Sequence, residues 1–204
     1  IADPELTLEL PALLTAATGM DALSHCLETY CSNVFNPVAG AIAIDGLRRG
    51  WANIKAVVAD GQNIVARSEM MMCAMQGALS FQKGLGVIHA VSHPLGALRQ
   101  KSLHHGTLNA VFMSHAIRFN SASAGKAMEN ISAALGISVG ADALAGAFSE
   151  MNRVIGLPES LSAMGVDASD LDGIAEDALL DHCGFTNPRP LTLENLRTFL
   201  KGAL

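Results

Sequence analysis

Charged and aromatic residues are scarce in this chain of 204 residues. Charged residues make up 16% and aromatic residues 4%, whereas hydrophobic residues make up 50%. This apolar content excludes a disordered chain and is enough for one sizeable core or, at most, two small ones. The formal net charge is −6 and no basic run occurs, so we expect no nucleic-acid partner.

Long apolar runs and paired cysteine motifs are also missing. No stretch reaches the roughly 18 uncharged apolar residues that a membrane span needs, so we expect no membrane partner. The acidic first residues, IADPELTLELP, do not resemble a signal peptide. The four cysteines show no CxxC spacing, so we expect free buried thiols and a reducing, cytoplasmic location. Because the chain begins at Ile1 rather than at a methionine, we expect something to precede it.

The abundant residues favour helices. Ala, Leu and Met are good helix formers, and no alternating strand pattern, internal repeat or low-complexity segment occurs. The sequence therefore predicts a single all-α domain, a helical bundle, over residues 1–204. Turn and capping residues place its helices at about 11–31, 38–59, 64–80, from 86 to about 97, 106–119, 126–135, 141–155, 171–181 and from Thr192 onward, with a polar break at 120–125.

Four of the seven histidines gather in the stretch 84–109, which reads GLGVIHAVSHPLGALRQKSLHHGTLN. His89 and His93 are four residues apart, which on a helix puts both on one face. Pro94, directly after His93, should kink this helix or delay its start. His104 or His105 can return to that face through the glycine that follows them. Converging imidazoles are one way to build a first-row metal site. The alternative, for any single histidine, is a buried ring that bonds to backbone carbonyls.

An acid for such a site occurs in the predicted helix 11–31. Asp21 and His25 are four residues apart and share a face, and the neighbours of Asp21 are Ala, Met and Leu. A carboxylate among apolar residues costs free energy unless it is paired or coordinated. The alternative is an exposed Asp–His pair worth a few tenths of a kcal/mol. With His89 alongside, we favour a ligand role for both residues.

Taken together, these segments resemble the C-terminal helical domain of the iron-containing (group III) alcohol dehydrogenases. The resemblance is carried by DPELTLELPALLTAATGMDALSHCLE, GLGVIHAVSHPLGA, LHHGTLNAV and NPRPLT, and it covers essentially the whole chain. In that family one Asp and three His bind a single divalent metal. The resemblance implies that the ligands here are Asp21, His25, His89 and His105. His105 is preferred to His104 because it directly precedes the glycine, as the family ligand does.

The resemblance also implies roles around the metal. His93 would lie beside the metal and the nicotinamide without being a ligand, and it could relay the alcohol proton. Thr7, His93 and His105 would lie at the bound dinucleotide. A metal with these four ligands keeps positions open to polarise an alcohol or carbonyl oxygen while hydride passes to or from the nicotinamide. The ligand set suits Fe(II) and also Zn(II), and the family selects iron.

A dinucleotide motif is missing, since neither GxGxxG nor a GGGS-type turn occurs. We therefore expect an N-terminal α/β domain outside this chain to bind NAD or NADP. The expected function is interconversion of small-molecule alcohols with aldehydes or ketones by a homo-oligomer, with this chain supplying the metal site and inactive alone. Phe35, Phe112 and Phe185 are candidates for lining the substrate pocket, with Phe185 preferred.

Three alternatives remain open. An isolated helical domain could act as a metal-binding or assembly module. A helical metallohydrolase is less favoured, because neither an adjacent His-Asp pair nor an HExxH helix occurs. A metal-free branch of the family, such as the maleylacetate reductases, is also less favoured, because all four ligand positions are filled.

Overall fold

The computed structural model describes residues 1–98 and 100–204, and these residues form helices without any strand. The all-α prediction is therefore confirmed. The α-helices are α1 Ala12–Cys31, α2 Pro37–Ala59, α3 Ile64–Ser80, α4 Val87–Gly96, α5 His105–Leu135, α6 Ala141–Val154, α7 Ile174–Leu180 and α8 Leu193–Gly202. Short 3-10 helices lie at Pro4–Thr7, Phe81–Lys83, Ser162–Met164, Ala168–Leu171 and His182–Thr186. None of the helices in the described ranges combines the length and apolar composition needed to cross a membrane.

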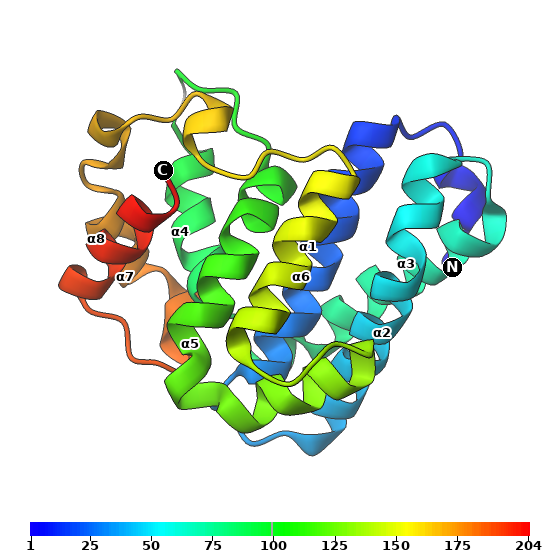
Figure 1. Ribbon diagram of the computed structural model, residues 1–204, viewed down its shortest axis with the longest axis horizontal. Coiled ribbons are helices and arrows are strands. Elements are labelled where there is room, and N and C mark those ends of the chain that lie inside the picture. Colours follow the sequence, from blue (N-terminus) through cyan, green and yellow to red (C-terminus); the bar gives the residue numbers. More distant parts are fainter. Residues whose placement is uncertain (99) are drawn as a thin grey trace.

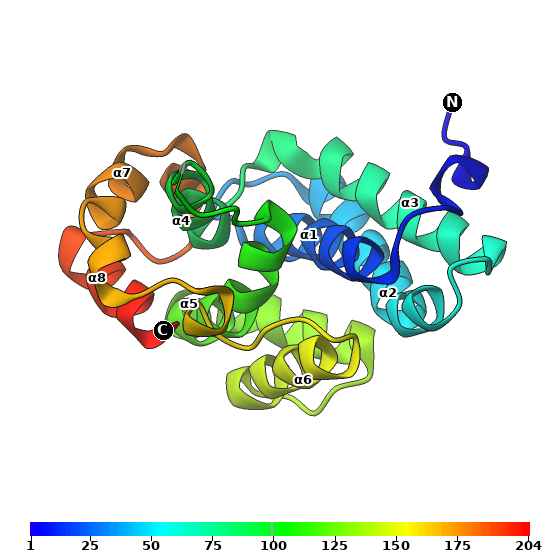
Figure 2. The same cartoon turned by 90° about the horizontal axis from the view of Figure 1, so that it is seen from above.

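Helix α1 lies between other helices and contacts α2, α3 and α5 (Figure 1). Its many buried residues face more than one side, as expected of a helix that is covered by several neighbours. On the other side of α5 lies α6, while α4 packs against both α5 and α7. Figure 2 shows α4, α7 and α8 gathered at one end of the molecule and α2 and α3 at the other, with α1 between them.

Two glycines allow α1, α2 and α3 to approach one another closely. A Cβ on Gly50 of α2 would lie 2.7 Å from the Sγ of Cys73 in α3. A Cβ on Gly77 of α3 would lie 3.0 Å from the Cβ of His25 in α1, so this glycine makes room for a predicted ligand. The four cysteines are free and buried, as predicted.

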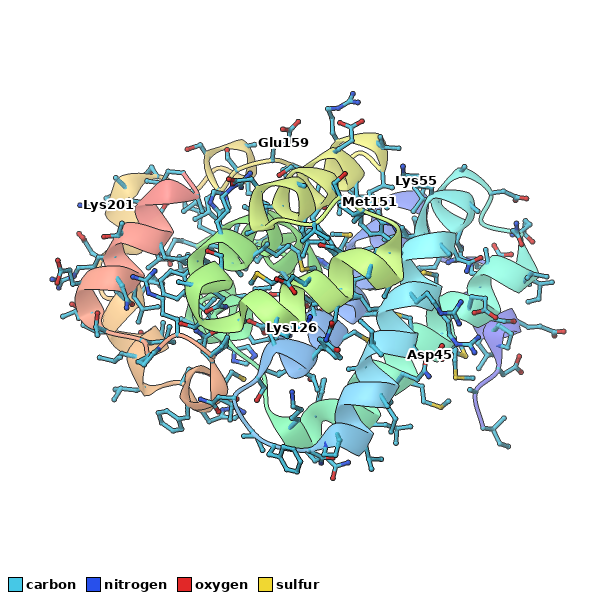
Figure 3. The ribbon with its side chains drawn as sticks, turned by 60° about the horizontal axis from the view of Figure 1, so that its bottom comes forward. Asp45, Lys55, Lys126, Met151, Glu159 and Lys201 are labelled. Carbon is cyan, nitrogen blue, oxygen red and sulfur yellow. The ribbon has the colours of Figure 1, made fainter. Side chains whose placement is uncertain are left out.

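A polar contact on the outer side of the bundle ties α2 to α3. The carboxylate of Asp45, labelled in Figure 3, accepts hydrogen bonds from Gln76 of α3 and from Arg49 and Arg48 of α2. These bonds hold the pKa of Asp45 well below its usual range. Arg49 also pairs with Glu69 of α3 at 2.8 Å. Because the pairs are partly exposed, they fix the relative position of the helices more than they stabilise the fold.

The predicted break at 120–125 is present as a kink at one residue, across which two helical segments of α5 join, rather than as a longer loop. Only Ala124 has a non-helical backbone there, with φ −121° and ψ 23°. The polar residues find partners without ending the helix. The amide of Asn120 is buried and exchanges hydrogen bonds with Asn187 at 3.1 and 2.8 Å, and the hydroxyl of Ser121 donates to the Arg118 carbonyl.

The predicted helix 171–181 was placed too early. A 3-10 helix occupies 168–171, and Gly173 then adopts φ +80°, so that α7 begins at Ile174. Glycine suits this left-handed backbone because it has no Cβ. The histidine helix α4 begins at Val87, so that Pro94 falls in its last turn. The basic sequence at 98–103 predicts a short turn, and residue 99 within it lies outside the described residues.

Candidate metal centre

One carboxylate and two imidazoles converge near the middle of α1. The Oδ1 atom of Asp21 lies 3.8 Å from Nε2 of His89 and 3.6 Å from Nε2 of His105. The donor atoms of these three residues all lie within 4.8 Å of one another. Two donors that each bond one cation at about 2.1 Å can lie at most about 4.2 Å apart, so the two measured separations are compatible with a shared ion. Mixed carboxylate and imidazole donors suit a first-row divalent cation.

Close contact between α5 and α1 places His105 at this point. A Cβ on Gly106 would lie 2.4 Å from the carbonyl oxygen of Ala17, so only glycine lets the first turn of α5 approach α1 this closely. His105 is the first residue of α5 and faces Asp21. His104 is the N-cap residue of α5 and is exposed. The geometry therefore brings His105, rather than His104, to the carboxylate.

His25 lies beside this group. Its Nδ1 is 4.0 Å from Oδ2 of Asp21, and its ring stacks on His89 with centroids 4.4 Å apart. Burial, followed by the electrostatic effect of the neighbouring His89, lowers the pKa of His25 to about 4. Burial also lowers the pKa of His105. Both rings are therefore kept neutral at pH 7, with a lone pair available for a cation.

Two buried polar residues complete the group, and the sequence reasoning missed both. The carboxylate of Glu28 accepts a 2.6 Å hydrogen bond from Nδ1 of His89. Nδ2 of Asn109 lies 2.6 Å from Oδ1 of Asp21, 3.2 Å from Nε2 of His89 and 3.0 Å from Nε2 of His105, while its buried Oδ1 has no partner. A sequence signal did exist, because Glu28 follows Asp21 by seven residues and Asn109 follows His105 by four, spacings that share a helix face.

His93 lies next to the donor group but outside it. Its ring stacks on His105 with centroids 5.6 Å apart, and its Nδ1 bonds to Oδ2 of Asp181 at 2.8 Å. Burial opposes ionisation of Asp181, yet hydrogen bonds from His93 and from the Cys183 N–H lower the pKa of its carboxyl. The His93 side chain is 39% exposed, so it connects the donor group with solvent. Asp181 is 88 residues away from His93 in sequence, and no local pattern pointed to it.

The other predicted contacts lie apart from the donor group. Thr7 lines a cavity of about 180 Å³ between α1 and α3, together with Arg67, and the described residues of that lining include none of the site histidines. Phe112 is fully buried in the core, so it does not line an open pocket. Phe185 and Phe35 are 71% and 91% exposed.

Residues 15–204 match the family model described as Fe-containing alcohol dehydrogenase family, C-terminal. The chain belongs to this family. It is 46% identical over 211 residues to the 4-hydroxybutyrate dehydrogenase of Cupriavidus necator, a match that covers 100% of this chain and 55% of that protein. It is 34% identical to the NAD-dependent methanol dehydrogenase of Bacillus methanolicus, again covering 100% of this chain and 55% of the relative.

Two solved structures share the fold. A 1,3-propanediol oxidoreductase superposes with a TM-score of 0.94 at 34% identity, covering 99% of this chain and 55% of that one. An alcohol dehydrogenase from Oenococcus oeni gives a TM-score of 0.93 at 30% identity, covering 99% of this chain and 54% of that one. The chain spans about half the length of the curated relatives it matches. The family resemblance inferred from the sequence motifs is thus confirmed.

Proposed function

We propose that this chain supplies the metal-binding half of the active site of an NAD(P)-dependent alcohol dehydrogenase. The convergence of Asp21, His89 and His105 within 4.8 Å is the observation that carries the proposal. Family membership and the names of the relatives support the reaction class. A bound divalent metal would supply a Lewis acid that polarises the oxygen of the alcohol or carbonyl substrate.

The roles of the site residues would follow from how deeply each side chain is buried. Asp21, His25, His89 and His105 would hold the cation, with Fe(II) favoured by the family and Zn(II) a possible substitute. The His89 side chain is only 2% exposed and forms the floor, whereas His105 is 40% exposed and Asp21 25%. The site therefore opens on the side of these two residues, and the substrate would approach there.

His93 stands at that opening. Held by Asp181 and 39% exposed, it would take the proton of the alcohol and pass it to solvent. If His93→Ala left both turnover and its pH profile unchanged in the full-length protein, this relay role would be refuted.

The hydride acceptor, NAD or NADP, would bind mainly to a domain outside this chain. The coverage of only about half of each relative supports that division. Thr7, His93 and His105 remain the proposed contacts of this chain with the dinucleotide. The substrate would be a small alcohol or its carbonyl product, and 4-hydroxybutyrate comes first because the relative of that specificity is 46% identical.

The test is an anaerobic assay of the Fe(II)-loaded full-length protein with NAD⁺ or NADP⁺ and a panel of small alcohols, read as absorbance of the reduced nicotinamide. We expect activity that is lost in His89→Ala and kept in Glu69→Gln, a matched change on the outer side of α3. Absence of alcohol-dependent reduction in a protein that binds both metal and dinucleotide would contradict the proposal and favour a binding or assembly module.

A further inference from the structure

The floor of the metal site is a buried pair, Glu28 and His89, whose side chains are each 2% exposed. Oε2 of Glu28 lies 2.6 Å from Nδ1 of His89, and Oε1 accepts a 2.6 Å hydrogen bond from the backbone N–H of Ile88. A carboxylate this deep is costly unless its oxygens are satisfied, and here both oxygens have a partner.

We propose that Glu28 is a positioning residue for the metal: it holds His89 in the tautomer with hydrogen on Nδ1, so that the lone pair of Nε2 faces Asp21. The inference rests on the metal site of the proposed function. Metal-binding histidines commonly give their second ring N–H to a carboxylate, which fixes the ring and its tautomer.

With Glu28 ionised, the donors and acceptors around His89 favour one arrangement. The Ile88 N–H can only donate and a carboxylate can only accept, so the hydrogen between Glu28 and His89 belongs to Nδ1. On the opposite side of the ring, Nδ2 of Asn109 lies 3.2 Å from Nε2 and 2.6 Å from Oδ1 of Asp21. Turning that amide over would set two acceptor oxygens against each other. Nδ2 of Asn109, which can only donate, therefore faces Nε2, and in this arrangement Nε2 carries the lone pair.

The backbone around Glu28 is shaped for this contact. A Cβ on Gly86 would lie 2.8 Å from Oε1 of Glu28, so a larger residue would push the carboxylate away. Gly86 is also the N-cap residue of α4, where free N–H groups favour an acidic partner. The carboxylate of Glu28 thus caps the first turn of α4 and also holds the ring of His89 in that turn. Together with Asp21 it balances the two positive charges of a divalent cation in a buried site.

The test uses the metal-free 204-residue chain labelled with ¹⁵N-histidine. The NMR chemical shifts of the ring nitrogens report the tautomer of each histidine. The signals that disappear in His89→Gln are those of His89. In wild type we expect His89 with hydrogen on Nδ1. In Glu28→Gln the amide oxygen keeps the bond from Ile88, so the amide NH₂ faces Nδ1 and shifts the hydrogen to Nε2. Chelator competition with Co(II) should then show an affinity about 10- to 100-fold lower.

Ile131→Val is the matched control for a general loss of stability, because Ile131 is fully buried in the distal part of α5. It should change neither the tautomer nor the affinity. A wild-type His89 with hydrogen on Nε2, measured without any substitution, would overturn the inference, as would a Glu28→Gln chain with unchanged tautomer and affinity. If the tautomer switches as expected while wild type binds no metal, the proposed function fails and the positioning of the ring by Glu28 stands.

Discussion

Gly106 is the residue at which α5 comes closest to α1, and Gly106→Ala should therefore open the metal group. The added Cβ would lie 2.4 Å from the carbonyl oxygen of Ala17 and 2.8 Å from its carbonyl carbon. Both are backbone atoms that cannot rotate away. Ordinary contact requires about 3.4 Å or more, so the first turn of α5 must move outward by about 1 Å.

A shift of this size matters because the neighbouring residue is His105. Its Nε2 lies 3.6 Å from Oδ1 of Asp21. An outward shift of about 1 Å widens this separation to about 4.6 Å, beyond the limit of about 4.2 Å that two bonds of about 2.1 Å impose. We expect His105 to be lost as a ligand. Overpacking should also destabilise the chain by about 1–3 kcal/mol, offset by up to about 1 kcal/mol from replacing glycine inside a helix.

Gly125→Ala supplies the control within the same helix. A Cβ on Gly125 would meet no atom within 4 Å beyond its chain neighbours and the backbone of its own helix. The change should therefore stabilise the chain by about 0.5–1 kcal/mol and leave metal binding unchanged. Urea unfolding gives the stability of both variants, and competition between Co(II) and a chelator gives their affinity. Equal affinity in Gly106→Ala and Gly125→Ala would refute the argument that close helix approach positions His105.

Two further predictions concern stability. Burial lowers the pKa of His25 from its usual 6.5 to about 4 in the fold, so the unfolded chain takes up a proton first as the pH falls below 6.5. The urea midpoint of the chelator-treated chain should therefore be lower at pH 5 than at pH 7.5, and an unchanged midpoint would contradict burial of this ring. Lys83→Met should destabilise the chain by about 2 kcal/mol or more, because the Lys83 ammonium donates to three backbone carbonyls at the end of α1. Lys126→Met, at the exposed side chain labelled in Figure 3, should change the free energy of unfolding by less than about 0.5 kcal/mol, and equal losses in both variants would contradict the capping role.

Residues of the site that lie one helical turn apart were readable from the sequence. Asp21 and His25 share a face of α1 because they are four residues apart, and this local spacing survives in the structure. The spacing of residues in the sequence could not predict that α1 lies against the site residues of α4 and α5. This contact depends on glycines such as Gly106, whose role becomes visible only when the opposing backbone is known. The family resemblance supplied what local geometry lacked.

The residues that support the site were harder to predict, because their partners are distant in sequence. Glu28 bonds to a ring 61 residues away, and Asp181 to one 88 residues away. The same reason explains why the break predicted at 120–125 is narrower in the structure, where only Ala124 is non-helical. Asn120 looked like a helix breaker in its local sequence, yet its amide pairs with Asn187, 67 residues further on, and the backbone stays helical up to the kink at Ala124.

Metal content tests the central claim most directly. This chain and its His89→Ala variant would be reconstituted anaerobically with Fe(II) or Zn(II), freed of excess ion and analysed for bound metal, alongside the same pair in the full-length protein. The account predicts one ion per chain in the wild type and a loss of that ion in His89→Ala. Equal metal content in the two proteins, or none in the full-length wild type, would contradict it.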